Sequence, residues 1–210
     1  MSNDLRILRD LGFTPEIATE LGHMCVAWAA LEFRMFCLFN RLSDLPVALA
    51  RASFYSHRST RDRGDLILTT AKMVLQGSQK REAAYTVLVK LLRSINRTAS
   101  KRNAYIHDPW AMEPDRPETV CQMRLSGSDL HGLGQLVSQK DLLQLTDQIV
   151  VWTNQLRALD DRMAPLLRAS LGKLDRTRFV TLAFEKTKPR RGHRRVRPTV
   201  QPPPPSTSFQ

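Results

Sequence analysis

The chain has 210 residues, of which 42% are apolar, and it carries 32 Lys and Arg against 20 Asp and Glu. This size and composition fit one domain with a hydrophobic core and exclude a small scaffold held by disulfides. The three cysteines, Cys25, Cys37 and Cys121, are odd in number and lack CxxC spacing. The sequence therefore predicts neither a disulfide framework nor a cysteine zinc site, and a reducing cytoplasm is the expected location.

The N-terminal sequence MSNDLRILRD has charges where a signal peptide has its apolar stretch, and the longest apolar runs are short. We therefore expect a soluble cytoplasmic protein that makes no contact with a membrane.

The net charge of +12 is divided unevenly along the chain. Residues 1–185 hold 25 cations against 20 acids, whereas residues 186–210 hold seven cations and no acid. The last segment also contains six prolines and few large apolar residues, so it cannot bury enough surface to offset its chain entropy. We expect a helical domain over 1–185 and a disordered, basic, Pro-rich tail over 186–210.

Helical periodicity dominates the first domain. Thr14, Pro15 and Glu16 supply an N-cap, a proline at the first helical position and an acid for the helix dipole. They predict a helix from about residue 15 to Ser43, and Pro46 predicts the start of a short helix to about residue 55. The first helix has a seam with alternating steps of four and three, made of Leu21, Cys25, Trp28, Glu32, Met35, Phe39 and Leu42.

Two further helices follow from capping residues. Ser59 or Thr60 can cap a helix over Arg61–Leu75, and Ser78 can cap a long helix over Gln79–His107. The long helix has an apolar stripe with an arginine near its end, made of Ala84, Val87, Leu88, Leu91, Leu92, Ile95, Ala99, Arg102 and Ile106.

Residues 109–137 change character, because prolines and glycines enclose the alternating run Thr119–Leu125. This pattern predicts a small β-hairpin or an ordered loop. Helical periodicity resumes at Asp141 and runs to about Leu171, while Arg178–Phe184 fits either a short strand or an extension of the helix. The predicted fold is all-α, a four- or five-helix bundle with this insertion before the last long helix.

The candidate for chemistry is the run from Arg102 to His107 at the end of the long helix. Asn103 and His107 are four residues apart and share a helical face, so the amide can orient the imidazole, while Arg102 lies beside Tyr105. His107 falls in the last helical turn, where the helix dipole favours an imidazolium.

An Arg-Asn-x-x-x-His sequence at the end of a bundle helix resembles the signature of the HEPN superfamily (higher eukaryotes and prokaryotes nucleotide-binding). The stretches 28–32, 51–54 and 59–61 are also similar to HEPN-related proteins of bacterial and prophage genomes, and the resemblance covers roughly residues 15–170. It implies a homodimer whose two motifs meet across a cleft and cleave RNA without a metal or other cofactor. The products would carry a 2′,3′-cyclic phosphate, and the setting would be bacterial defence, a toxin or a phage.

The resemblance also implies roles for individual residues. Arg102 would bind the scissile phosphate, His107 would transfer protons and Asn103 would orient His107. Glu32 would pair with Arg102 or another arginine inside the bundle, with Tyr105 as a further supporting residue. Members paired with a nucleotidyltransferase antitoxin carry Tyr where this chain has Pro109, so that subclass is not expected and the partner protein, if one exists, is undefined.

Other cations are expected to bind phosphates through counterion release, with little sequence preference. They are Arg58 and Arg61 near a helix start and Lys188, Arg190, Arg191, Arg194, Arg195 and Arg197 in the tail. The alternatives are a solvated basic face and a tail that only solubilises the protein. Trp110 fits either a core anchor or a platform for a base, and no metal site is predicted.

Two alternative functions remain open. The chain fits a catalytically inactive HEPN-like module that binds RNA or a nucleotide, or that mediates dimeric interaction. It also fits a plain helical bundle in which the motif is a coincidence, with Arg102 in a salt bridge and His107 as a C-capping residue.

Overall fold

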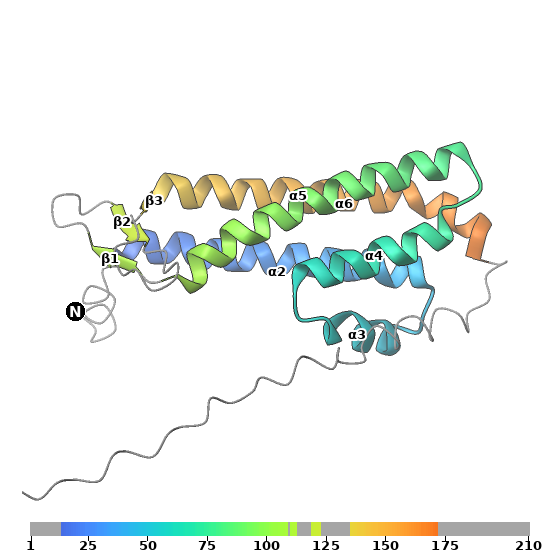
Figure 1. The fold of residues 1–210 in the computed structure, drawn as a ribbon, viewed down its shortest axis with the longest axis horizontal. Coiled ribbons are helices and arrows are strands. Elements are labelled where there is room, and N and C mark those ends of the chain that lie inside the picture. The colour runs from blue at the N-terminus through green and yellow to red at the C-terminus, as the bar shows by residue number, and fades with distance from the viewer. Residues whose placement is uncertain (1–13, 109, 113–118, 123–134, 172–210) are drawn as a thin grey trace, which may run out of the picture.

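The computed structural model of the protein describes residues 14–108, 110–112, 119–122 and 135–171. The described part is mostly helical, as the sequence predicts, and long helices lie side by side in a bundle (Figure 1). The helices are α2 (Pro15–Ser43), α3 (Val47–Ser56), α4 (Thr60–Val74), α5 (Gln79–His107) and α6 (Gln139–Leu171). The strands are β1 (Trp110–Met112), β2 (Thr119–Gln122) and β3 (Gln135–Ser138).

α2, α4 and α5 begin where short polar side chains cap them, whereas α3 begins after Pro46 without a side-chain cap. Thr14 accepts a hydrogen bond from the Ile17 backbone N–H at 3.3 Å, and Ser59 accepts one from the Asp62 N–H at 3.0 Å. Ser78 caps α5 in the same way. Because these bonds satisfy backbone donors that have no partner inside the helix, the predicted starts of α2, α4 and α5 are confirmed.

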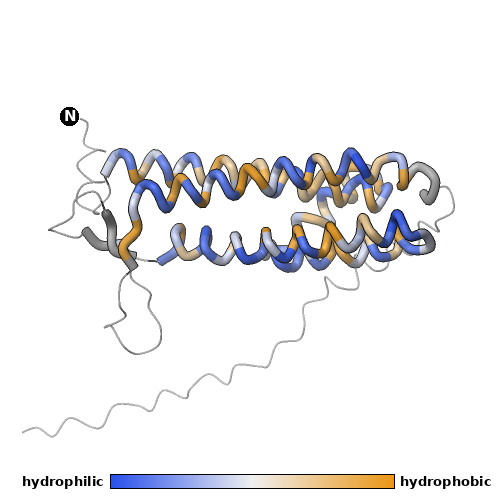
Figure 2. The backbone as a smooth tube through the Cα atoms, turned by 90° about the horizontal axis from the view of Figure 1, so that it is seen from above, coloured by the Kyte–Doolittle hydropathy of each residue, from blue (hydrophilic) through white to orange (hydrophobic). Residues whose placement is uncertain are grey.

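The core lies between α2, α4, α5 and α6, with α2 packed along α6 and against α4, and α5 packed against α6 and α4. Apolar and hydrophilic residues alternate along each helix in Figure 2, as expected for amphipathic helices. The fully buried side chains of α2 are Met24, Leu31, Met35, Leu38 and Leu42, with Trp28 and Phe39 almost fully buried.

The predicted seam of α2 is wrong in part, because Cys25 is exposed and Leu21 is only half-buried. The true seam runs through Met24, Leu31 and Leu38, rotated around the helix from the predicted one. α2 is apolar almost all round, so two seams with steps of four and three exist and periodicity cannot choose between them. On α5, Val87 is also misassigned, since it is 47% exposed at the edge of the stripe.

α2 has a second property that follows from its composition. By length and hydropathy alone it is long and apolar enough to cross a membrane, although in the structure it is the central helix of the bundle. Only part of the apolar surface of α2 is buried in the bundle, since Val26 and Phe33 are 72% and 54% exposed.

The three strands form an antiparallel sheet in the order β1-β2-β3 near the end of the bundle where α5 ends and α6 begins (Figure 1). Val120 of β2 pairs with Met112 and with Val137. Val137 is fully buried and packs with Ile17 and Leu142. Three paired strands are thus present where the sequence predicts a hairpin or an ordered loop. The links 113–118 and 123–134, the run 178–184 and the tail 186–210 lie outside the described residues.

Candidate functional site

Arg102 is anchored on the bundle by an aromatic ring. It lies in the last part of α5, and its guanidinium carbon is 5.7 Å from the ring centroid of Trp28, which is only 4% exposed. Its Nη1 donates a hydrogen bond to Asn103 Oδ1 at 3.0 Å, while its Nε is buried and has no hydrogen-bond partner among the described residues. The cation–π contact and the amide hold the guanidinium in one place.

His107 is the last residue of α5 and is exposed. The backbone of Asp108 is extended, with ψ of 145°, and its N–H donates to the Ala104 carbonyl, so the helix ends where Asp108-Pro109 predicts. The structure pairs the Asn103 carbonyl with Arg102, whereas we expect it to orient His107. A helical step of four does place Asn103 and His107 on one side of the helix, but Asn103 Oδ1 accepts from the adjacent guanidinium, and a charged donor forms the stronger hydrogen bond.

Tyr105 connects α5 to the sheet. Its ring is 6.0 Å from the ring of Trp110, whose Nε1 donates to the Tyr105 carbonyl at 3.1 Å. Both residues pack against the small cluster of Ile17, Val137 and Leu142. These contacts favour a structural role for Trp110 and Tyr105, because both rings are partly buried against apolar side chains.

Glu32 pairs with an arginine inside the bundle, and that arginine is Arg63 of α4 and not Arg102. Arg63 Nη1 lies 2.6 Å from Glu32 Oε1, and the two side chains are 13% and 26% exposed respectively. Arg63 Nε also donates to the His57 carbonyl at 3.0 Å. The guanidinium carbon lies 5.5 and 5.4 Å from the ring centroids of Phe54 and Tyr55. Arg63 is therefore part of the packed interior between α2, α3 and α4 and is not a solvated surface cation.

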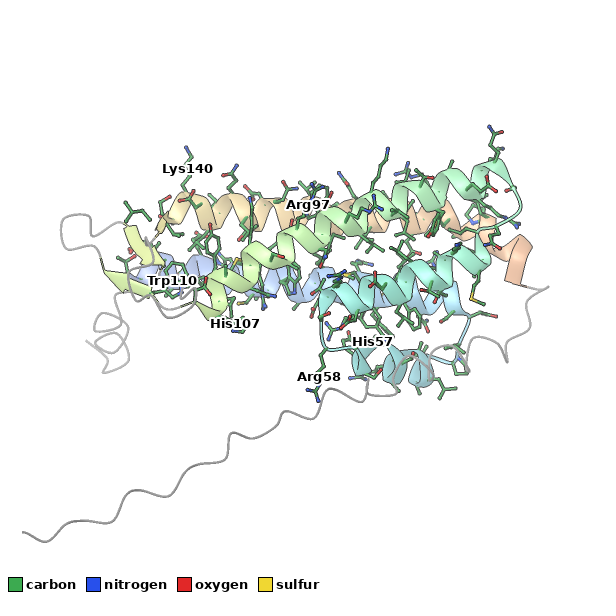
Figure 3. The ribbon with its side chains drawn as sticks, viewed as in Figure 1. His57, Arg58, Arg97, His107, Trp110 and Lys140 are labelled. Carbon is green, nitrogen blue, oxygen red and sulfur yellow. The ribbon has the colours of Figure 1, made fainter. Side chains whose placement is uncertain are left out.

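The other predicted cations lie at the surface or outside the described residues. Arg58 and Arg61 are exposed at the start of α4. In Figure 3, His107 and Arg58 lie on the lower side of the bundle, whereas Arg97 and Lys140 lie on the upper side. The tail cations from Lys188 to Arg197 lie beyond residue 171 and outside the described part.

Neither Arg102 nor His107 lines any of three hollows that described residues form along the bundle. The largest of these three, of about 1100 Å³, is an apolar groove between α2 and α3 that Phe33, Phe36, Val47 and Tyr55 help to line. A polar groove of about 570 Å³ lies between α5 and α6. A hollow of about 360 Å³ between α4 and α5 has Arg61 and Arg93 in its lining.

Two carboxyl groups outside the Arg102 site have shifted pKa values. Hydrogen bonds from the hydroxyl and the backbone N–H of Ser138 lower the pKa of Asp141 at the start of α6. Burial raises the pKa of Asp160 even though Arg41 Nε lies 3.0 Å from it. Within the described ranges, no group of three or more His, Cys, Asp or Glu side chains is placed to hold a metal ion.

Sequence reasoning misses two features of the surface. One is Trp28 beneath Arg102, because nothing local in the sequence links residues 74 positions apart. The other is a row of exposed cations on α5, made of Lys90, Arg93, Arg97 and Lys101. Their steps of three and four residues are visible in the sequence and are the signal that would have found them.

The fold and the site define a helical-bundle protein with an anchored arginine and an exposed histidine at the end of its α5 helix. No family model, no curated protein and no solved structure matches this chain.

Proposed function

We propose that the protein is a metal-independent endoribonuclease of the HEPN type that acts as a homodimer. One observation carries the proposal: a guanidinium fixed on Trp28 is followed, five residues along the same helix, by an exposed imidazole at the helix end. A fixed cation is suited to a phosphate, and an exposed imidazole is suited to proton transfer near neutral pH.

In the proposed homodimer the two copies bring their Arg102 and His107 side chains to one site, and the reaction needs no group beyond these and the RNA itself. The 2′-hydroxyl oxygen attacks the adjacent phosphorus, the bond to the 5′-oxygen breaks, and the products are a 2′,3′-cyclic phosphate and a 5′-hydroxyl. His107 accepts the proton of the attacking hydroxyl or supplies the proton of the leaving oxygen. Arg102 stabilises the negative charge that develops on the phosphate oxygens.

We propose that the second copy of the chain packs against the outer face of α2, which lies opposite the buried seam of that helix. This outer face consists of Gly22, Val26, Ala29 and Phe33, all exposed and uncharged, at steps of four, three and four residues. A seam with this spacing is self-complementary when two copies meet about a two-fold axis. Each chain carries a net charge of +12, so two copies are expected to meet on a face without charge.

Cleavage of RNA in EDTA tests the proposal. Purified wild type and His107→Ala are incubated with total RNA, and the 3′ ends of the products are examined for cyclic phosphate. We expect wild type to cleave and His107→Ala to lose at least about a hundredfold in rate, the usual contribution of a proton-transfer group. His23→Ala is the matched control, because the side chain of His23 is 63% exposed on another helix.

Absence of cleavage by wild type, or equal cleavage by His107→Ala, would overturn the nuclease. The second candidate is a catalytically inactive RNA-binding module. It is favoured by the hydrogen bond that joins Asn103 to Arg102 and leaves His107 without the amide that was expected to orient it. In that case RNA binding by wild type and by His107→Ala is the same.

A further inference from the structure

The positive charge of the described bundle is concentrated on one helix. α5 carries seven Lys and Arg and one acid, Glu82, whereas the rest of residues 1–185 is close to neutral. Between Glu82 and Asp108 the chain has five cations and no acid. Such a concentration on one element is the electrostatic footprint that a polyanion recognises.

Four of these cations form what we call the α5 basic row: Lys90, Arg93, Arg97 and Lys101. All four are exposed, on the side of α5 away from the buried Leu88, Ile95 and Ala99. None of the four forms an ion pair with a carboxylate of the described residues. Arg97 is held only by a hydrogen bond to Ser94 Oγ at 3.3 Å. The row spans about 16 Å along the helix, since an α-helix rises 1.5 Å per residue.

A groove runs beside the row. Arg97 and Lys101 line the hollow of about 570 Å³ between α5 and α6, together with hydroxyl, amide and aromatic groups. These groups belong to Ser94, Thr98, Tyr105, Gln144, Gln148 and Trp152. Trp152 is fixed there, because its Nε1 donates to Thr98 Oγ1 at 3.0 Å.

The groove has one negative end. Asp141 is the acidic residue in its lining, and the Ser138 hydroxyl and backbone N–H bind its Oδ2 at 2.7 and 2.8 Å. An anion is therefore favoured beside Arg97 and Lys101 and disfavoured beside Asp141. Figure 3 shows Arg97 and Lys140 toward the upper side of the bundle and His107 toward its lower side. The row ends at Lys101, directly before Arg102, so it leads along α5 to the candidate cleavage site.

From this arrangement we infer that the α5 basic row and the groove beside it bind the phosphodiester backbone of single-stranded RNA. Adjacent members of the row are about 4.5–6 Å apart along the helix axis, by the rise of 1.5 Å per residue, a spacing that lets each cation meet a different phosphate. Amides and hydroxyls in the groove offer hydrogen bonds to sugars and bases without selecting a sequence. The inference deepens the proposed function, on which its choice of RNA rests, but it concerns binding and not cleavage.

Binding of an uncleavable strand tests the row. The probe is a fluorescent 20-nucleotide strand with 2′-O-methyl riboses, which cannot form a cyclic phosphate. Because the protein cannot cleave this strand, binding is measured with the full wild-type chain, and Arg102 and His107 stay intact. The row variant is Arg93→Gln, Arg97→Gln and Lys101→Gln. The matched control, with the same change in net charge, is Lys72→Gln, Lys80→Gln and Arg157→Gln, three exposed cations outside the row and the groove.

We expect the row variant to lose RNA affinity on the order of a hundredfold at 0.1 M salt. The slope of log K against log salt should fall by about 2, because three phosphate contacts are lost and a single strand releases about 0.7 counterion per contact. We expect the control to change affinity by only a few-fold. Equal affinities and slopes for the two variants would overturn the inference. It would also be overturned if the row variant bound RNA normally but lost binding to phosphatidylserine vesicles or to an acidic protein. Cleavage is measured separately, so failure of the row and failure of the nuclease are distinguishable.

Discussion

At the residue scale, Arg63 shows how a cation becomes part of a core. Its guanidinium lies over the rings of Phe54 and Tyr55 and donates to both Glu32 and the His57 carbonyl. Glu32 is therefore a structural partner that ties α2 to α4. Arg102 has a comparable aromatic support on Trp28, but its partner is an exposed amide, and that difference keeps it available for a ligand.

Removal of the charge on Glu32 is predicted to destabilise the fold. Glu32→Gln keeps the shape of the side chain but leaves Arg63 partly buried without its counter-charge. We expect a loss of about 1–3 kcal/mol in the free energy of unfolding, measured by urea denaturation. Asp147→Asn, at an exposed position on α6, is the control and is expected to stay within about 0.5 kcal/mol of wild type. An equal effect of the two substitutions would mean that the ion pair contributes nothing.

At the element scale, the residues at which the helices begin were predictable from the sequence, but the side that each helix buries was not. Thr14, Ser59 and Ser78 cap helices within three residues of themselves, so their roles can be inferred from local sequence. The seam of α2 and the partner of Glu32 depend on helices distant in the sequence. The same limit applies to the candidate site, where residue types and spacing predict Arg102 and His107 but not the ring beneath Arg102.

The uncharged outer face of α2 leads to a prediction about assembly. Val26→Glu places a carboxylate at its centre without touching the core, because Val26 is 72% exposed. We expect the homodimer to dissociate, with the dimer dissociation constant raised on the order of a hundredfold by the cost of burying an unpaired charge. Cleavage should fall with it, since the site needs both copies.

Light scattering during size-exclusion chromatography gives the mass of the particle. Val150→Glu, a matched substitution at a valine that is 45% exposed on α6, is expected to keep the dimer. If the wild-type protein is monomeric at all concentrations, the proposal that a second copy packs against this face is wrong. Binding of wild-type protein to neutral lipid vesicles, lost in Val26→Glu, would assign the face to a membrane.

At the scale of the whole molecule, the proposed function gives two sets of cations a part in binding RNA. The tail contributes seven cations from sequence alone, and the α5 basic row contributes four on a folded surface. The two sets differ in what they determine. A segment with many cations and no acid raises affinity for any polyanion, whereas a row fixed on a helix also sets the path of the bound strand.

Deletion of residues 186–210 is predicted to separate affinity from catalysis. We expect the slope of log K against log salt for RNA to fall by up to about 5, from seven lost contacts at about 0.7 each. The rate of cleavage at saturating RNA is expected to stay within a few-fold of wild type, because the tail contains neither Arg102 nor His107. A truncated protein that binds RNA with an unchanged salt slope would show that the tail has no part in binding.

The α5 basic row also has a cost that the molecule bears when no RNA is bound. The four residues form three adjacent like-charged pairs at helical spacing, and each pair is unfavourable by about 0.2–0.5 kcal/mol. The pairs are Lys90 with Arg93, Arg93 with Arg97, and Arg97 with Lys101. A protein that no longer needed to bind would gain about 0.6–1.5 kcal/mol by replacing them. Selection of random variants for heat resistance alone would therefore remove cations from α5 first, and the hottest-melting survivors would be the poorest RNA binders.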